Sequence, residues 1–256
     1  MSNDSPRAGT GPRPLQGKRA LVTGAAVRVG RAIALAFARA GADVAVHYRG
    51  SSAAARQTAD EIRALGVRAA LVQADQALPG EPERMVAEAA HALGGLDLVA
   101  LSAAAFEKVP ATDLDRARFE AMLAVNLTGP FLIARAAHPH LRASRGAIVS
   151  VLDLCGTSQV WKGYAHYAAA KAGLAALTRL LALEWAPEVR VNGIAPGTAI
   201  APAETTADEH ERLVRRIPLG REGSPEDVAQ AAVFLASAPF ITGQILAVDG
   251  GRSINP

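Results

Sequence analysis

Tyr167 and Lys171 stand four residues apart in a segment, 164–185, that has the apolar spacing of a helix. Residues four apart share one face of a helix, so the phenol and the ammonium are predicted to be neighbours. The free pKa of tyrosine is about 10, and a nearby ammonium favours the phenolate and lowers that pKa. The pair is therefore predicted to act as a general acid and base. Most tyrosine–lysine pairs at this spacing are only neighbours on the surface of a helix. Whether this pair is catalytic therefore depends on the elements that surround it.

Phosphate binding is the second chemistry that the sequence suggests. The segment TGAAVRVG (23–30) follows a short apolar run and precedes a helical pattern. Gly24 permits a tight turn, Gly30 permits close helix packing, and the start of the helix offers free N–H groups to a pyrophosphate. Arg28 stands where such a turn commonly has its middle glycine. Its side chain either reaches the pyrophosphate or a polar substrate, or lies on the surface.

The residues after the second predicted strand indicate the cofactor. An acidic side chain there would bind the 2′-hydroxyl of NAD, whereas a basic or hydroxyl side chain accommodates the 2′-phosphate of NADP. The stretch HYRGSS (47–52) has no acid, and Arg49 and Ser51 supply a guanidinium and a hydroxyl. NADPH is therefore the predicted cofactor. Asp75, after the third predicted strand, either accepts a hydrogen bond from the adenine amino group or caps the next helix.

The elements that would position these residues alternate along the chain. Predicted strands cover residues 18–23, 43–48, 68–74, 96–101, 147–152, 190–194 and 244–248. Predicted helices cover residues 31–39, 53–65, 82–93, 114–127, 130–142, 164–185 and 225–237. This alternation is typical of an α/β fold with a doubly wound, mostly parallel sheet. We expect one Rossmann-type domain of seven strands over residues 18–256, preceded by a flexible tail at 1–17.

The composition excludes several classes of protein. The net charge of +3 comes from dispersed basic residues, so no nucleic-acid partner is expected. Charged residues and glycines interrupt every apolar stretch before 18 residues, so no membrane span is expected. The single cysteine, Cys155, cannot form an internal disulfide and fits a cytoplasmic protein, where it is better explained as a buried filler than as a reactive thiol. The six histidines show no metal-ligand spacing, so no metal is expected.

Taken together, the motifs resemble the short-chain dehydrogenases/reductases over residues 17–254. The matching segments are TGAAVRVG (23–30), Asp75, Val125-Asn126, YAAAK (167–171), RVN (190–192), Pro196-Gly197 and VDGG (248–251). The resemblance implies that Asn126 holds a water in a proton relay with Lys171, which also binds the nicotinamide ribose. It implies that Pro196 and Gly197 shape the nicotinamide pocket. The further cofactor contacts that it implies are Val29, Tyr48 and Ser102.

Two departures from the family pattern indicate a branch. The serine that usually precedes the tyrosine is absent, and Asp153 stands at the corresponding strand end, 14 residues before Tyr167. The usual Asn-Asn-Ala-Gly stretch after the fourth strand reads LSAA (101–104), followed by Ala105 and Phe106. With Arg28 and HYR (47–49), these features resemble the pteridine reductases and the bacterial dihydromonapterin and dihydrofolate reductases.

That resemblance implies that Phe106 stacks a pterin against the nicotinamide, that Arg28 faces cofactor phosphate and substrate, and that Asp153, Tyr167 and Lys171 deliver the proton. A core position for Phe106 and a strand-end cap for Asp153 remain alternatives. The predicted activity is hydride transfer from NADPH to a C=N or C=O bond of a pterin or dihydrofolate-like ring. The alternatives are a carbonyl reductase of 3-oxoacyl thioesters or other ketones, and a non-catalytic NADP-binding sensor.

Three further expectations concern the surroundings of the site. The segment 198–215 is expected to form a substrate lid. His166 is expected to point away from the face of Tyr167 and to be solvated. The family resemblance also implies a homotetramer built on the helices around 114–142 and 164–185 and on the C-terminal segment, although the apolar faces of these helices are equally consistent with internal packing.

Overall fold

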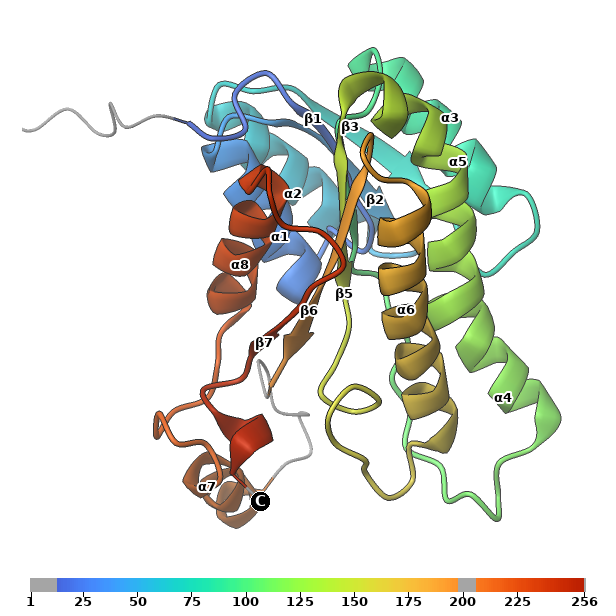
Figure 1. The fold of residues 1–256 in the computed structure, drawn as a ribbon, viewed down its shortest axis with the longest axis vertical. Coiled ribbons are helices and arrows are strands. Elements are labelled where there is room, and N and C mark those ends of the chain that lie inside the picture. Colours follow the sequence, from blue (N-terminus) through green and yellow to red (C-terminus); the bar gives the residue numbers. More distant parts are fainter. Residues whose placement is uncertain (1–12, 198–205, 256) are drawn as a thin grey trace, which may run out of the picture.

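The computed structural model describes residues 13–197 and 206–255. They form one sheet of seven parallel strands in the order β3-β2-β1-β4-β5-β6-β7 (Figure 1). The strands are β1 (Arg19–Val22), β2 (Asp43–Tyr48), β3 (Ala69–Gln73), β4 (Leu98–Leu101), β5 (Ala147–Val151), β6 (Arg190–Pro196) and β7 (Ile245–Val248). The strand order reverses between β1 and β4, and ligands of such sheets bind beside this point at the carboxyl ends of the strands. The predicted α/β fold is confirmed.

Helices cover both faces of the sheet (Figure 1). One face carries α1 (Arg28–Arg39), α2 (Ser52–Ala64) and α8 (Pro225–Ser237), and the other carries α3 (Glu81–Leu93), α5 (Gly129–Ser144) and α6 (Ala165–Glu184). Successive strand residues point to opposite faces, so Val22 packs with the first group of helices and Leu21 with the second. The two cores hold the strands between them and thereby fix the positions of the strand ends.

The helix pair predicted at 114–142 is joined by a distorted turn. Helix α4 (Arg116–Leu123) runs into a π-helical turn over Ala124–Thr128, and α5 follows without a loop. Asn126 lies within this turn and is buried. Single π-helical turns inside helices occur frequently at functional sites. The periodicity of the sequence predicts the two helices but not the turn that joins them.

The folded domain begins before the predicted boundary at residue 18. Leu15 is 2 % exposed, and its N–H donates a hydrogen bond of 2.9 Å to the carbonyl oxygen of Ala40. The Gly17 N–H donates likewise to Gly41 at 3.2 Å. The assignment of residues 13–17 to a tail is therefore wrong, because Leu15 anchors this segment on the core. The rest of the predicted tail, 1–12, lies outside the described residues.

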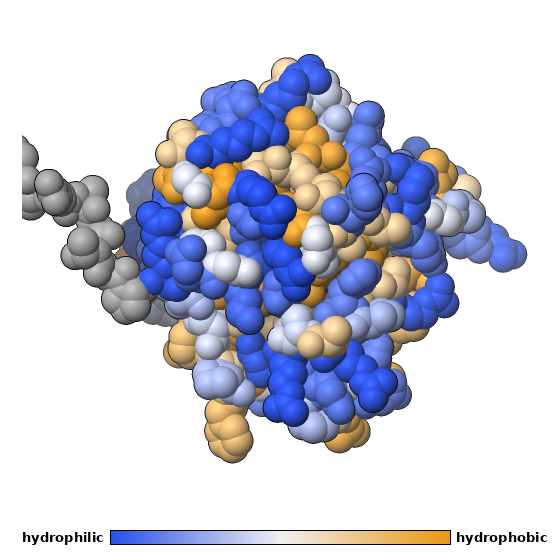
Figure 2. Space-filling view, turned by 90° about the horizontal axis from the view of Figure 1, so that it is seen from above, coloured by the Kyte–Doolittle hydropathy of each residue, from blue (hydrophilic) through white to orange (hydrophobic). Residues whose placement is uncertain are grey.

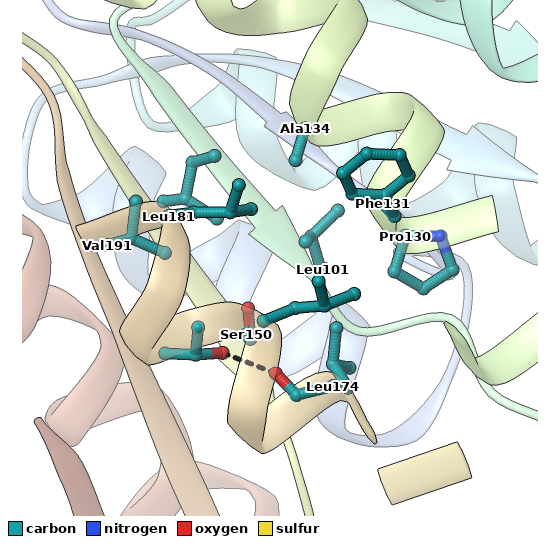
Figure 3. Close-up of a pocket in the computed structure, with 11 residues that line it drawn as sticks. Leu101, Pro130, Phe131, Ala134, Ser150, Leu174, Leu181 and Val191 are labelled. Carbon is teal, nitrogen blue, oxygen red and sulfur yellow. Dashed lines mark hydrogen bonds between the residues drawn. The ribbon is translucent and has the colours of Figure 1, made fainter. Parts of the chain in front are cut away.

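Two of the cavities formed by the described residues lie between the sheet and its helices and at the amino ends of β1 and β4. One of about 10 Å³ sits between the sheet and helices α5 and α6, among mainly apolar side chains (Figure 3). This volume corresponds to about one water molecule. The other, about 400 Å³, lies beside Arg19, Asp97 and His140, where β1 and β4 begin. Figure 2 views this end of the molecule, most of which is covered by hydrophilic residues. Tyr167 and Lys171 line neither cavity.

Candidate active site

Tyr167 and Lys171 lie on α6, beside the carboxyl end of β5 at the lower end of the sheet in Figure 1. The Tyr167 hydroxyl donates a hydrogen bond of 2.8 Å to Oδ2 of Asp153, two residues beyond β5. The Lys171 ammonium donates to the Val151 carbonyl oxygen at 2.9 Å and lies 5.6 Å from the centroid of the Tyr167 ring. One strand end and one helix thus bring together the three groups predicted to transfer a proton.

The ionisation of this group differs from the expectation. Burial, together with the charge of Asp153, raises the pKa of Tyr167, and burial also raises the pKa of Asp153. Burial lowers the pKa of Lys171 to about 8. The prediction that Lys171 lowers the pKa of Tyr167 is wrong, because the ammonium bonds to a carbonyl group while the phenol faces a carboxyl group. At neutral pH the phenol is neutral and can donate a proton.

Asp153 uses its two carboxylate oxygens differently. Oδ1 accepts a hydrogen bond of 2.8 Å from the Cys155 N–H, which closes the turn after β5. Oδ2 accepts the bond from Tyr167. The strand-end cap and the contact with the tyrosine, which were alternatives in the sequence, are therefore both made. The turn holds the carboxyl group in the orientation that faces the phenol.

Aromatic side chains form one wall of the site: Phe106, Trp161, Tyr164 and Tyr167. The ring of Phe106 stacks on Tyr164 with centroids 4.7 Å apart and meets Tyr167 edge-on at 4.9 Å. Trp161 meets Tyr164 edge-on at 5.9 Å. Phe106 remains 49 % exposed, so it is not a core residue. Most of these rings lie at steep angles to one another, and the exposed Phe106 ring offers a face on which a planar group can stack.

The glycine turn between β1 and α1 has the close contacts that its sequence predicts. Gly24 has φ of +66°, and a Cβ there would lie 2.9 Å from the Cα of Ala103. A Cβ at Gly30 would collide with the carbonyl group of Gly24. Arg28 adopts φ of +51° and is exposed, which explains why glycine is common at this position. Val29 is partly buried against the core behind the turn.

Side chains from two other strand ends hold the segment that replaces the usual Asn-Asn-Ala-Gly. The Thr23 hydroxyl accepts hydrogen bonds from the N–H groups of Ser102 at 2.9 Å and Ala103 at 3.0 Å. The amide of Gln76, after β3, donates to the carbonyl oxygens of Ala103 at 3.3 Å and Val125 at 2.7 Å. The segment therefore keeps a defined path without asparagines of its own. Gln76 was not predicted from the sequence, because its role depends on contacts between distant segments.

Asn126 binds the same segment from the other side. Its side-chain amide donates to the carbonyl oxygens of Ala105 at 3.0 Å and Met122 at 3.2 Å, and its Oδ1 accepts from the Ala105 N–H at 3.3 Å. The side chain is thus engaged in holding backbone. The proton relay with Lys171 that the family resemblance implies for Asn126 stays a prediction.

The end of β2 carries the groups predicted to select NADP. Arg49 is 73 % exposed at its side chain and lies 3.8 Å from Oδ2 of Asp75, while Oδ1 of Asp75 accepts from the Ala77 N–H at 3.1 Å. Asp75 therefore closes a turn and does not cap the next helix, α3, whose N-cap is Gly80. Its predicted hydrogen bond with the adenine amino group stays a prediction. Ser51 immediately precedes α2 and is exposed, and Tyr48 is half-buried. The exposed Arg49 guanidinium and the Ser51 hydroxyl fit a 2′-phosphorylated dinucleotide.

On the far side of the site, Pro196 ends β6, and the Gly197 N–H donates to the Val248 carbonyl oxygen at 2.9 Å. A Cβ at Gly197 would lie 2.8 Å from the Cα of Asp249, so the two segments approach closely. Of the predicted lid, residues 207–215 form α7 (Ala207–Arg215), and 198–205 lie outside the described residues. The pocket role of Pro196 and Gly197 stays a prediction.

Comparison with known proteins agrees with this arrangement. A family described as enoyl-(acyl carrier protein) reductase matches residues 24–253. The chain belongs to the short-chain dehydrogenases/reductases. It is 38 % identical to 3beta-hydroxysteroid dehydrogenase 1 of Eggerthella lenta over 94 % of this chain and 96 % of that protein. It is 36 % identical to the 3-oxoacyl-[acyl-carrier-protein] reductase FabG of Staphylococcus aureus over 91 % of this chain and 97 % of that protein.

A solved short-chain dehydrogenase of Burkholderia cenocepacia in complex with NADP superimposes with a TM-score of 0.88, at 36 % identity, over 93 % of this chain and 99 % of that one. The predicted family, its oxidoreductase class and its NADP cofactor agree with these relatives. The relatives do not favour the pteridine reductase branch, which stays a prediction based on Arg28, Phe106 and Asp153.

Two further residues near Tyr167, His166 and Cys155, can be compared with their predicted environments. His166 is fully buried, its two ring nitrogens have no hydrogen-bond partner among the described residues, and Nε2 lies 3.8 Å from Glu107. The prediction that it is solvated is wrong, because α6 turns it toward the segment after β4. Cys155 is buried, and burial raises its pKa to about 11, so its thiol stays protonated and unreactive.

Trp161 and Tyr164 are parts of the aromatic wall that were not predicted from the sequence. They precede Tyr167 by six and three residues. This spacing brings the aromatic rings close together where the chain enters α6. This spacing was the signal available in the sequence. Within the residues that the structure describes, no helix is long and apolar enough to cross a membrane, and no three potential metal ligands cluster.

Proposed function

We propose that this enzyme uses NADPH to reduce a C=N or C=O bond in a flat heterocycle of the pterin or dihydrofolate type. The observation that carries the proposal is the 2.8 Å hydrogen bond between Tyr167 and Asp153 in a buried site beside the aromatic wall. A carboxyl group with a raised pKa suits proton exchange with a ring nitrogen better than the serine of the general family pattern does.

NADPH, when bound, supplies the hydride that adds to the carbon of the C=N or C=O bond. The Tyr167 hydroxyl gives its proton to the nitrogen or oxygen of that bond, so one hydride and one proton complete the reduction. Asp153 accepts a hydrogen bond from the same hydroxyl and orients it. Lys171, charged below about pH 8, lies 5.6 Å from the centroid of the Tyr167 ring and would bind the nicotinamide ribose. Asn126 and water would return a proton through Lys171.

Several residues would bind cofactor and substrate. The start of α1 with Arg28 would bind the pyrophosphate, and Arg49 with Ser51 would bind the 2′-phosphate. Phe106 would stack on the substrate ring from the exposed side of the aromatic wall. The side chain of Arg28 is long enough to contact both the phosphate and a polar edge of the substrate. Each of these binding roles is inferred from the residue's position in the fold and from the charge or ring of its side chain.

A ketone reductase is the second candidate, and the similarity to FabG and to a hydroxysteroid dehydrogenase favours it. The two candidates are separated by the rate of NADPH oxidation with dihydrobiopterin, dihydrofolate and a panel of ketones. Turnover of the pterins at a higher kcat/KM supports the proposal, and turnover of ketones only would refute it. NADPH binding without turnover of any substrate would instead support the sensor.

We also propose an assembly and a location for this protein, each with its own test. A homotetramer is proposed because the exposed side chains of Leu180 and Leu183 on α6 offer apolar area to a second copy. Sedimentation equilibrium of the full chain should then give four times the mass of 26.4 kDa. A cytoplasmic location is proposed from the single cysteine, and cell fractionation would test it.

A further inference from the structure

His47 is a buried polar side chain to which the proton-transfer mechanism assigns no role. It lies in β2 and is 2 % exposed. Its ring contacts the glycine turn after β1 and the residue after β3, both at the carboxyl ends of the strands, where the cofactor is proposed to bind; this is called the cofactor side below. Its Nδ1 accepts a hydrogen bond of 3.1 Å from the N–H of Gly24. Its Nε2 lies 3.1 Å from the carbonyl oxygen of Ala74, immediately after β3. One imidazole thus joins the glycine turn to the end of β3.

The two partners determine where the ring proton lies. A backbone N–H can only donate, so Nδ1 facing Gly24 carries no proton. A carbonyl oxygen can only accept, so Nε2 facing Ala74 carries it. The ring is therefore neutral and both nitrogens are satisfied, which agrees with the lowering of the His47 pKa by burial. No other protonation state makes both bonds.

The backbone of His47 holds the same turn. The N–H of Ala25 donates to the His47 carbonyl oxygen at 2.9 Å. Two successive N–H groups of the turn, from Gly24 and Ala25, are therefore bound to one residue and are not directed at a ligand. The N–H groups left for a pyrophosphate are those further along, where α1 begins at Arg28. The position of His47 thus sets where the helix presents them.

We propose that His47 is a positioning residue for cofactor binding, which holds the glycine turn so that the start of α1 meets the pyrophosphate. It acts through the turn and not through the nucleotide. The proposed role of His47 depends only on the binding of NADP(H), which the comparison with relatives supports whatever the substrate is. Its failure is therefore distinguishable from a failure of the pterin assignment, because binding is measured without turnover.

The test compares the dissociation constants of NADPH and NADH, measured by cofactor fluorescence, in the wild type, His47→Leu and His47→Asn. The leucine removes both hydrogen bonds, and it should weaken both cofactors about tenfold, with kcat at saturating NADPH changed less than about twofold. The asparagine places an acceptor where Nδ1 lies and should recover most of the affinity. An effect on NADPH alone, or no rescue by asparagine, would overturn the proposal.

A matched control separates positioning from loss of stability. Asn192 is also fully buried, and its amide also joins two backbone groups, donating to Ile241 at 2.9 Å and accepting from Gln244 at 3.0 Å. Asn192→Leu should lower the unfolding temperature as His47→Leu does, but leave the NADPH dissociation constant unchanged. Equal weakening of NADPH binding by both variants would assign the effect to stability and contradict the proposal.

If His47→Leu does not fold, the wild-type protein still tests the geometry. The ¹⁵N chemical shifts of the imidazole should identify a neutral ring with its proton on Nε2, and the Gly24 amide should exchange slowly with solvent. A ring protonated on Nδ1, or a rapidly exchanging Gly24 amide, is incompatible with the proposed contact. This measurement requires neither cofactor nor substrate.

Discussion

On the cofactor side of the site, His47 holds the glycine turn through hydrogen bonds to Gly24 and Ala74, whereas on the substrate side Phe106 contacts other rings and is 49 % exposed. Hydrogen bonds are directional and fix individual atoms. Ring contacts tolerate a range of angles and separations. The cofactor side is therefore built to bind one kind of molecule in one position, and the substrate side can change its specificity through few side chains.

Tyr167 lies where the two sides meet, and its replacement should have the largest effect. Tyr167→Phe keeps the ring contacts and removes the proton donor, so kcat should fall about 10²- to 10⁴-fold while NADPH binding is retained. Steady-state kinetics and a fluorescence titration measure the two quantities. Tyr164→Phe is the matched control, since it removes the hydroxyl of a neighbouring wall residue and should affect kcat far less. A Tyr167→Phe enzyme with full turnover would disprove the assigned donor.

The next largest effect should appear at the cofactor side alone. Arg49→Ala removes the guanidinium assigned to the 2′-phosphate, so the KM for NADPH should rise about 10- to 100-fold while the KM for NADH changes little. Parallel assays with the two cofactors provide the measurement. Arg56→Ala, an exposed arginine one turn into α2, is the control and should change neither value. Equal effects of Arg49→Ala on both cofactors would remove the 2′-phosphate assignment.

The pH dependence of kcat/KM tests Lys171, which is assigned both to cofactor binding and to proton transfer. The pKa of Lys171 is lowered to about 8, so the ammonium is charged below that pH and neutral above it. Because the charged form supports proton transfer, kcat/KM should fall as the pH rises through about 8, by up to tenfold per further unit. The raised pKa of Tyr167 keeps the phenol protonated over the same range. A flat profile to pH 10 would contradict this assignment.

The smallest effect is expected on the substrate side. Phe106→Ala removes one face of the aromatic wall, so the KM for a flat substrate should rise about 3- to 10-fold with little change in the KM for NADPH. Phe106→Tyr, which keeps the ring, is the control and should retain the affinity. A rise in the KM for NADPH instead would place Phe106 on the cofactor side and weaken the comparison.

The features of the cofactor side that the sequence indicates are those with local signals. The glycine turn, Arg49 and the spacing of Tyr167 and Lys171 each lie within a few residues and follow from backbone geometry. The seven strands are also predictable, since apolar runs of five to seven residues alternate with helical patterns. Local signals therefore suffice where one element carries the whole feature.

The remaining features depend on contacts between distant segments. Gln76 reaches Val125 across 49 positions of the chain, and His47 reaches Gly24 across 23. The pKa of Tyr167 is raised because folding buries it beside Asp153, whereas the i, i+4 rule alone predicts only the effect of Lys171. Neither the burial of a side chain nor its partner from another strand can be read from the spacing of residues along one helix.

We propose that Asp153 adapts a ketone-reducing site to a ring with a basic nitrogen, and one ratio tests this proposal most directly. This is kcat/KM for dihydrobiopterin divided by kcat/KM for a good ketone substrate, measured in the wild type and in Asp153→Ser. Restoring the serine of the general family pattern should lower the ratio at least about tenfold, with the NADPH dissociation constant unchanged. A ratio that stays constant, or a wild type that reduces only ketones, would contradict the account.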